Sequence, residues 1–212
     1  MDFQLYYAEG SAAMHVRTLL EELNLFYDLR EVSIEMDEER PADMLKYNPN
    51  GWVPVLVWGE KSMYECGAIT TFLCDRNPEM AMAPNVVAEM RGEFHQWLFY
   101  FSSSIQNAFQ MSYYPFRFCN SKEDEASVTE RAQSRLRETF TVVDDAMADR
   151  KWVLGDQFGA VDLYLFMLTT WLDDSLGHPS VEDFPNIHRI TQQVMLRPSV
   201  QKVYANYIKE NG

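Results

Sequence analysis

The sequence has little cysteine, few basic residues and no long apolar run. Its three cysteines, Cys66, Cys74 and Cys119, follow no spacing typical of a zinc site or a disulfide framework, so we predict free thiols. The 18 basic and 32 acidic residues give a net charge of −14, which repels nucleic acid and anionic lipid surfaces. No apolar stretch approaches the ~18 residues of a membrane-spanning helix, and because Met1-Asp2-Phe3-Gln4 lack the basic and apolar regions of a signal peptide, we expect none. These absences argue against nucleic-acid or membrane partners and predict a cytoplasmic protein.

Hydrophobic residues make up 47% of the 212 and aromatic residues 14%, enough to fill a sizeable core. The first 80 residues alternate short β-rich runs with amphipathic stretches, which predicts a mixed α/β unit of order βαβαββα. The helix after the first strand is expected to be capped by Ser11, and Gly59-Glu60 is expected to turn a hairpin. We expect strands at 3–7, 27–34, 53–58 and 61–64. We also expect three helices: a first that begins near residue 11, a second that ends near residue 47 and a third that spans 66–76.

The pattern changes after residues 77–84, a linker with prolines at both ends. Long helical periodicities then predict an all-α unit, so we expect two domains, 1–80 and 85–212. Gly159 is the expected N-cap of a helix that is apolar on every side at 163–168, with Asp162 in its first turn. The expected helices lie at 87–111, 123–148, 159–172, 186–196 and 199–209.

Three stretches appear in a characteristic order. They are N-P-N-G-W-V-P-V-L at 48–56, Y-E-C-G-A-I at 64–69 and L-G-D-Q-F-G-A-V-D at 154–162. Together with F-P-N at 184–186 and R-P-S-V at 197–200, they resemble the cytosolic glutathione transferase superfamily over nearly the whole chain. The chain departs from the family pattern in having Trp52 for Gln or Lys, Cys66 for Ser, Gly159 for Ser or Thr, and Val161 for Ala.

The resemblance implies a thioredoxin-like domain followed by a helical domain, assembled as a homodimer. Glutathione would lie on the first domain and a small hydrophobic electrophile against the second. No metal is implied, and the four histidines, His15, His95, His178 and His188, show no metal-site spacing. A catalytic triad, a P-loop and a dinucleotide fingerprint are also missing from the sequence.

The resemblance also assigns glutathione-binding residues. The Val53-Pro54 bond would be cis, with the main chain beside Trp52 and Val53 pairing with the cysteine of glutathione; the alternative is an ordinary strand-opening proline. Glu65 would take the γ-glutamyl amino group and Cys66 would replace the serine that holds the γ-glutamyl carboxylate. Alternatively, Glu65 is simply a carboxylate at a helix start.

Two residues compete to stabilise the glutathione thiolate. Ser11, at a helix start, would act together with the helix dipole, whereas Tyr6 lies in the first strand on the opposite face from Leu5 and Tyr7. We predict Ser11, with Tyr6 as the alternative and a purely capping role for Ser11 also open. Aromatic residues and hydroxyls, among them Trp97, Phe99, Tyr100, Phe101, Ser104, Tyr113, Tyr114 and Phe116, are candidates for lining an electrophile pocket or for forming core.

The predicted function is therefore a glutathione transferase, active in detoxification, that activates glutathione as a thiolate and conjugates it to an electrophilic small molecule. One alternative is a glutathione-dependent isomerase, dehalogenase or etherase. Another is a non-catalytic binding or regulatory protein of the same fold.

Overall fold

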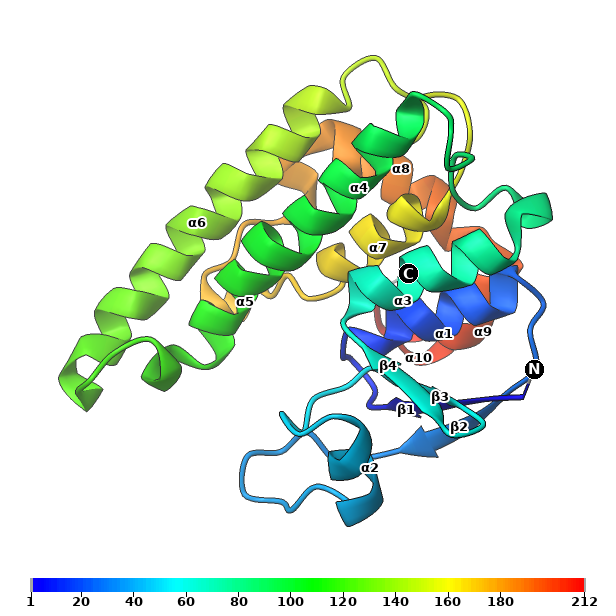
Figure 1. Cartoon of the computed structure of the whole chain (residues 1–212). Coiled ribbons are helices and arrows are strands. Elements are labelled where there is room, and N and C mark those ends of the chain that lie inside the picture. The colour runs from blue at the N-terminus through cyan, green and yellow to red at the C-terminus, as the bar shows by residue number, and fades with distance from the viewer. Residues whose placement is uncertain (1, 212) are drawn as a thin grey trace. The chain divides into compact units, whose positions relative to one another are not determined.

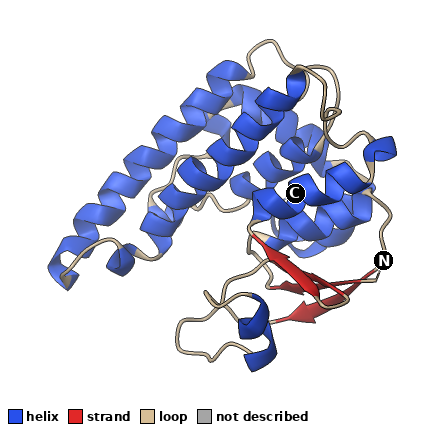
Figure 2. Cartoon of the chain, in the orientation of Figure 1, coloured by secondary structure: helices blue, strands red, loops and turns tan. Residues whose placement is uncertain are grey.

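The computed structural model describes residues 2–211, which form two compact units. The first unit runs to Ala88 and resumes at Leu196, and the second spans Glu89–Met195. All strands belong to the first unit and the second is helical (Figure 2). The chain leaves the first unit near the predicted linker. Its return to that unit after Met195 differs from the predicted helical domain at 85–212.

The first unit is built on a four-stranded sheet of order β2-β1-β3-β4. β1 is parallel to β2 and antiparallel to β3, and β3 and β4 form the predicted hairpin through Gly59, whose φ is +56°. With the intervening helices, these strands confirm the predicted order βαβαββα. The strands are β1 (Phe3–Tyr7), β2 (Tyr27–Glu31), β3 (Val55–Trp58) and β4 (Lys61–Tyr64).

Helices cover both faces of this sheet, with α1 and α3 on one face and α2 on the other (Figure 1). Side chains alternate along β1, so Tyr7 lies under Arg17 of α1 while Tyr6 packs against Met44 of α2. The helical elements of this unit are α1 (Ala13–Glu22), α2 (Ala42–Tyr47), α3 (Cys66–Arg76), a 3₁₀ turn at Pro78–Met80, α9 (Pro198–Val203) and α10 (Ala205–Asn211).

The C-terminal segment is attached to α1 by charged groups. The Arg197 guanidinium donates to both carboxylate oxygens of Glu22, at 2.6 and 2.7 Å, and Ser199 donates to the same carboxylate. Lys202 donates to Glu21 at 2.8 Å. A bidentate arginine–carboxylate pair fixes orientation as well as distance, so α9 has a defined position on α1.

The second unit contains a helix that the sequence pattern predicted as one piece at 87–111. It consists of α4 and α5 joined by a π-helical turn, a form that is rare and occurs mostly as single turns within α-helices. No helix among residues 2–211 is long and apolar enough to cross a membrane. The helices are α4 (Met90–Tyr100), the π-turn (Phe101–Ile105), α5 (Gln106–Tyr113), α6 (Glu125–Ala146), α7 (Ala160–Thr169) and α8 (Pro185–Met195), with 3₁₀ turns at Pro115–Arg117, Lys122–Asp124, Asp174–Leu176 and Val181–Asp183.

α7 is the centre of the second unit, because every residue in it is buried, as its apolar sequence predicted. Gly159 is its N-cap, also as predicted, with an extended backbone at φ −154°. The buried Asp162 carboxylate accepts the N–H of Gly159 and the N–H of Val153, both at 2.8 Å. This carboxylate therefore closes the loop at 153–159 onto the helix start.

Candidate functional site

The predicted site residues lie in three segments that meet at one edge of the sheet. Tyr6 of β1 is opposite Val55 of β3, and Val55 is opposite Tyr64 of β4. Because both pairs are antiparallel, the segments that follow β1, precede β3 and follow β4 all emerge at this edge. The topology thus brings together the segments carrying Ser11, Val53-Pro54 and Glu65-Cys66, which are far apart in sequence.

The segment before β3 is a loop held by its own polar groups. The Val53-Pro54 peptide bond is cis, which confirms the prediction. The buried Asn48 side chain donates to the Trp52 carbonyl at 2.8 Å and accepts the N–H of Asn50 at 3.1 Å. Gly51, at φ +70°, completes the turn. The backbone at 52–54 is therefore fixed from within the loop.

The start of α3 has an unusual backbone. Glu65, its N-cap, adopts φ +73° and ψ +115°, a conformation that non-glycine residues rarely take. The Glu65 side chain makes no capping hydrogen bond, and the first turn of α3 holds no acidic residue. The first N–H groups of a helix have no intrahelical carbonyl, and here neither the N-cap side chain nor the first turn supplies a carboxylate for them. Strained backbone of this kind concentrates at functional sites, and an uncapped helix start suits an anion.

Behind this edge, a buried hydrogen-bond chain joins the starts of α1 and α3. Thr70 donates to the Cys66 carbonyl at 2.7 Å and lies 2.8 Å from His15 Nε2. A hydroxyl has a single hydrogen, so His15 must donate through Nε2. The Cys66 thiol is buried and donates to the Ala12 carbonyl at 3.6 Å. All three cysteines are free thiols.

Ser11 lies at the predicted edge but one residue before the N-cap of α1, which is Ala12. Its hydroxyl accepts the N–H of Ala13 at 3.2 Å, so it still serves the helix start as predicted. The same hydroxyl donates to the Ala8 carbonyl at 2.6 Å. To reach a bound sulfur, the Ser11 hydrogen would have to turn away from Ala8.

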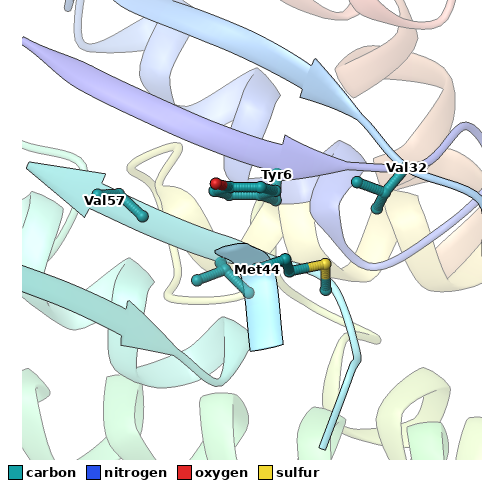
Figure 3. Close-up of a cluster of buried hydrophobic side chains, with 5 residues drawn as sticks. Tyr6, Val32, Met44 and Val57 are labelled. Atoms are coloured by element: carbon teal, nitrogen blue, oxygen red, sulfur yellow. The ribbon is translucent and has the colours of Figure 1, made fainter. Parts of the chain in front are cut away.

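Tyr6 points to the α2 face, where its ring packs in a buried cluster with Val32, Met44 and Val57 (Figure 3). Its hydroxyl donates to the Asp43 carboxylate at 3.0 Å. Burial and the neighbouring Asp43 raise the pKa of this phenol above its usual value. At neutral pH Tyr6 therefore keeps its proton and donates it in a hydrogen bond to Asp43 of α2.

Two segments of the chain match one family. Residues 5–81 match Glutathione S-transferase, N-terminal domain, and residues 95–198 match Glutathione S-transferase, C-terminal domain. The chain belongs to the glutathione S-transferase superfamily. This confirms the resemblance, together with the fold of a thioredoxin-like unit and a helical unit.

Relatives in the superfamily are distant in sequence but similar in length or fold. Glutathione S-transferase GstA of Escherichia coli O157:H7 is 26% identical, over 93% of this chain and 95% of that protein. Protein URE2 of Candida albicans is 24% identical, over 88% of this chain but only 64% of that protein. The crystal structure of a glutathione transferase homologue from Sulfitobacter, with bound glutathione, superposes with a TM-score of 0.87 at 24% identity, over 96% of this chain and 97% of that one.

The aromatic residues of the transferase helical unit divide into two groups. Trp97 and Phe101 are buried, 5.8 Å apart between ring centroids, so they form core. Phe99 is 70% exposed. A pocket lined by the exposed members stays a prediction. A separate hollow lies between α6 and the turn at Gly177, and no predicted site residue lines it.

Sequence reasoning missed Arg40 and the pair of His15 and Thr70. Arg40 follows an acidic run, and nothing in its spacing signals that it folds back onto the loop at 51–52. His15 and Thr70 lie on the apolar faces of their helices, and only the packing of α1 on α3 brings them together. Among the described residues, no group of three or more His, Cys, Asp or Glu is arranged to hold a metal ion.

Proposed function

We propose that this superfamily member binds glutathione at the sheet edge and conjugates its sulfur to an electrophilic small molecule. The observation that carries the proposal is the start of α3, where Glu65 has a strained backbone and neither its side chain nor an acidic residue of the first turn caps the helix. This start shares the edge with Val53-Pro54 and Ser11. A relative of the same fold carries glutathione in its crystal structure, which supports the choice of ligand.

The edge offers complements to the γ-glutamyl and cysteine parts of an extended tripeptide. The N–H groups at the start of α3 suit the γ-glutamyl carboxylate, and the exposed Glu65 carboxylate suits the γ-glutamyl amino group. The main chain at Val53 would pair with the cysteine residue as an added strand does. The sulfur would then point toward the start of α1.

At that position Ser11 would stabilise the sulfur as a thiolate. The positive end of α1 and a hydrogen bond from the Ser11 hydroxyl both favour the charged form, which is the nucleophile. Attack on an aryl halide would form the carbon–sulfur bond and release halide, so no redox partner is needed. Tyr6 is the weaker candidate, because its hydroxyl donates to Asp43 on the α2 face.

The ligand site is tested by placing a carboxylate where none exists. Ala68, exposed in the first turn of α3, is replaced by Glu, with Ala68→Gln as the uncharged control. We expect calorimetry to show glutathione binding to the wild type, a loss of about tenfold or more in Ala68→Glu, and little change in Ala68→Gln. Equal affinity in both variants would remove the α3 start from the site.

The thiolate is tested by ultraviolet absorbance of bound glutathione against pH, alongside conjugation to a chlorodinitrobenzene. In Ser11→Ala we expect the glutathione thiol pKa to rise and turnover at neutral pH to fall, with affinity nearly unchanged. Tyr6→Phe should be mild. A shift confined to Tyr6→Phe would assign the role to Tyr6.

A second candidate function is glutathione binding without catalysis. It is favoured by the Ser11 hydroxyl, which donates to Ala8, and by the match to Protein URE2, a relative whose name does not describe a transferase. Binding without thiolate absorbance or turnover would establish it. Turnover only with substrates of isomerisation, dehalogenation or ether cleavage would assign one of those reactions. The homodimer, the cytoplasmic location and a role in detoxification remain predictions of this proposal.

A further inference from the structure

The start of α3, proposed to receive the γ-glutamyl carboxylate of glutathione, would bind it through backbone N–H groups. Helix ends fray, and the N–H groups of a first turn have no carbonyl of their own helix to hold them. A carboxylate gains most from such groups when they are oriented before it arrives. Contacts behind the edge, which hold this helix start, are therefore expected to influence binding.

Thr70, one turn into α3, holds the carbonyl of Cys66. Thr70 is fully buried, and its hydroxyl donates to the Cys66 oxygen at 2.7 Å. A peptide unit is planar, so the Cys66 carbonyl and the Gly67 N–H belong to one rigid group and point in opposite directions. A bond that fixes the Cys66 carbonyl therefore also fixes the direction of the Gly67 N–H, in the first turn of α3.

His15 of α1 in turn holds the Thr70 hydroxyl. His15 is fully buried, and its Nε2 lies 2.8 Å from Thr70 Oγ1. Because the single hydrogen of the hydroxyl is directed at the Cys66 carbonyl, the hydroxyl accepts the N–H of His15. In the low-dielectric interior, consecutive hydrogen bonds of this kind strengthen one another. The side chain of α1 thus fixes the hydroxyl that orients the first turn of α3.

A second contact joins the same two helices at their starts. The Cys66 thiol donates to the carbonyl of Ala12, the N-cap of α1, at 3.6 Å. Cys66 is thus held at its carbonyl by Thr70 and at its side chain by α1, which lies beside α3 in Figure 1. The preceding Glu65 has the strained φ of +73°, a conformation that persists only where surrounding contacts enforce it.

Thr18 of α1 offers a matched comparison. It is buried like Thr70, and its hydroxyl also donates to the carbonyl four residues earlier, that of Met14, at 2.8 Å. This bond lies within α1 and does not involve the Cys66 peptide. Thr18 therefore resembles Thr70 in residue type, burial and local bond, and differs from it in position.

We propose that His15 and Thr70 are positioning residues for the γ-glutamyl carboxylate, which orient the first N–H groups of α3 through the Cys66 carbonyl. Both side chains are buried behind the edge and act through the backbone of α3. This inference rests on the proposed glutathione site. It assigns part of the selectivity for the γ-glutamyl end to a side chain on a second helix.

The test compares two ligands that differ only at the γ-glutamyl carboxylate, by calorimetry on the full chain. The ligands are glutathione and its analogue in which that carboxylate is a primary amide. We expect the wild type to bind glutathione about tenfold or more tightly than the amide analogue. In Thr70→Val, glutathione should weaken about three- to tenfold, whereas the amide analogue should change less than about twofold.

Further variants separate positioning from packing. Thr70→Ser restores the hydroxyl and should keep the wild-type preference within about twofold. Thr18→Val removes a buried hydroxyl from α1 and should leave the preference unchanged. His15→Leu removes the donor to Thr70 and should reduce the preference less than Thr70→Val does, because the bond from Thr70 to Cys66 remains.

Equal weakening of both ligands in Thr70→Val would assign a purely structural role to the pair and overturn the inference. An unchanged preference in Thr70→Val, or no preference in a wild type that binds glutathione, would overturn it as well. If Thr70→Val does not fold, an unchanged preference in His15→Leu has the same meaning. Failure of the wild type to bind glutathione would instead refute the proposed function on which the inference rests.

Discussion

Two helices of the second unit begin in a different way from two helices of the first unit. In the second unit, buried carboxylates cap α7 and α8: Asp162 accepts two backbone N–H groups, and Asp144 of α6 accepts those of Asn186 and Ile187 at 2.8 and 2.9 Å. In the first unit, α1 receives the Ser11 hydroxyl at its start, and the N-cap of α3, Glu65, makes no capping hydrogen bond with its side chain.

The difference shows that a helix start can serve either folding or ligand binding. A helix start satisfied by the chain's own carboxylate has a folding role and has no capacity left for a ligand. A start without one remains electropositive, and an anionic ligand can supply the missing acceptor. The comparison therefore predicts where substitutions reduce stability and where they reduce binding.

The largest effect is expected at the capped start of α7. Asp162→Ala leaves the buried N–H groups of Val153 and Gly159 without an acceptor, which should lower the free energy of unfolding by about 3 kcal/mol or more. Denaturant titration measures it. Asp156→Ala, an exposed carboxylate of the same loop, should stay within about 0.5 kcal/mol. Similar values for the two variants would mean that the cap is not needed.

Substitutions at the start of α3, where Glu65 makes no side-chain cap, should reduce ligand binding rather than stability. Glu65→Ala is expected to weaken glutathione binding by about 1.5–3 kcal/mol, through loss of the partner for the amino group. Glu65→Gly should lose the same affinity yet gain about 1 kcal/mol in stability, because glycine tolerates φ +73°. Calorimetry and thermal unfolding separate the two effects, with exposed Glu60→Ala as the control. A Glu65→Ala variant with full affinity would contradict a binding role.

The stability of the fold should depend on pH through His178 of the second unit, whose ring is hydrogen-bonded. His178 Nδ1 accepts the N–H of Asp173 at 3.2 Å, and its Nε2 lies 2.7 Å from Ser112 Oγ, so the ring is neutral. Burial lowers the pKa of His178 below its ordinary 6.5. As the pH falls below 6.5, the unfolded chain takes up a proton that the folded chain does not, and stability falls.

The loss of stability stops once the pH falls below the pKa of His178 in the folded chain. Between pH 6.5 and that pKa, the free energy of unfolding falls by at most about 1.4 kcal/mol per pH unit. Denaturant titrations between pH 5 and 8 measure the slope. His178→Gln should flatten it at some cost in overall stability. An unchanged slope in His178→Gln would assign the pH dependence to other groups.

The smallest effect is expected at Gly159, the N-cap of α7, which has no side chain. Gly159 has an extended backbone, which any residue adopts, and Gly159→Ser adds a hydroxyl that can accept an N–H of the first turn. We expect a gain of a few tenths of a kcal/mol in unfolding free energy. A clear decrease in melting temperature would indicate close packing at this position.

Local signals in the sequence were sufficient for most of the fold. The hairpin at Gly59, the end of α3 before Asn77-Pro78 and the apolar run of α7 each depend on neighbouring residues, and the structure confirms them. The π-helical turn at Phe101–Ile105 was not predicted, because it changes the period by less than one residue per turn. The predicted helix at 199–209 is interrupted at Tyr204 and forms α9 and α10.

The site was predictable where a motif exists and not where tertiary contacts decide. The motif at 48–56 indicated the cis bond at Val53-Pro54. The positive φ of Glu65 has no sequence signal, since glycine is the residue that favours it. Asp144 caps α8 across 42 residues, and Arg40 folds back onto Trp52, so both required the assembled chain.

The return of α9 to α1 has a consequence for biosynthesis. Glu22 emerges from the ribosome early, but its partners Arg197 and Ser199 are translated only after the whole second unit. The α/β unit therefore cannot finish folding before the C-terminal segment has been translated. Until then, the part of α1 that binds Arg197 and Ser199 has no partner from that segment. Expression of residues 1–80 alone would leave the Glu22 carboxylate without the guanidinium that neutralises it.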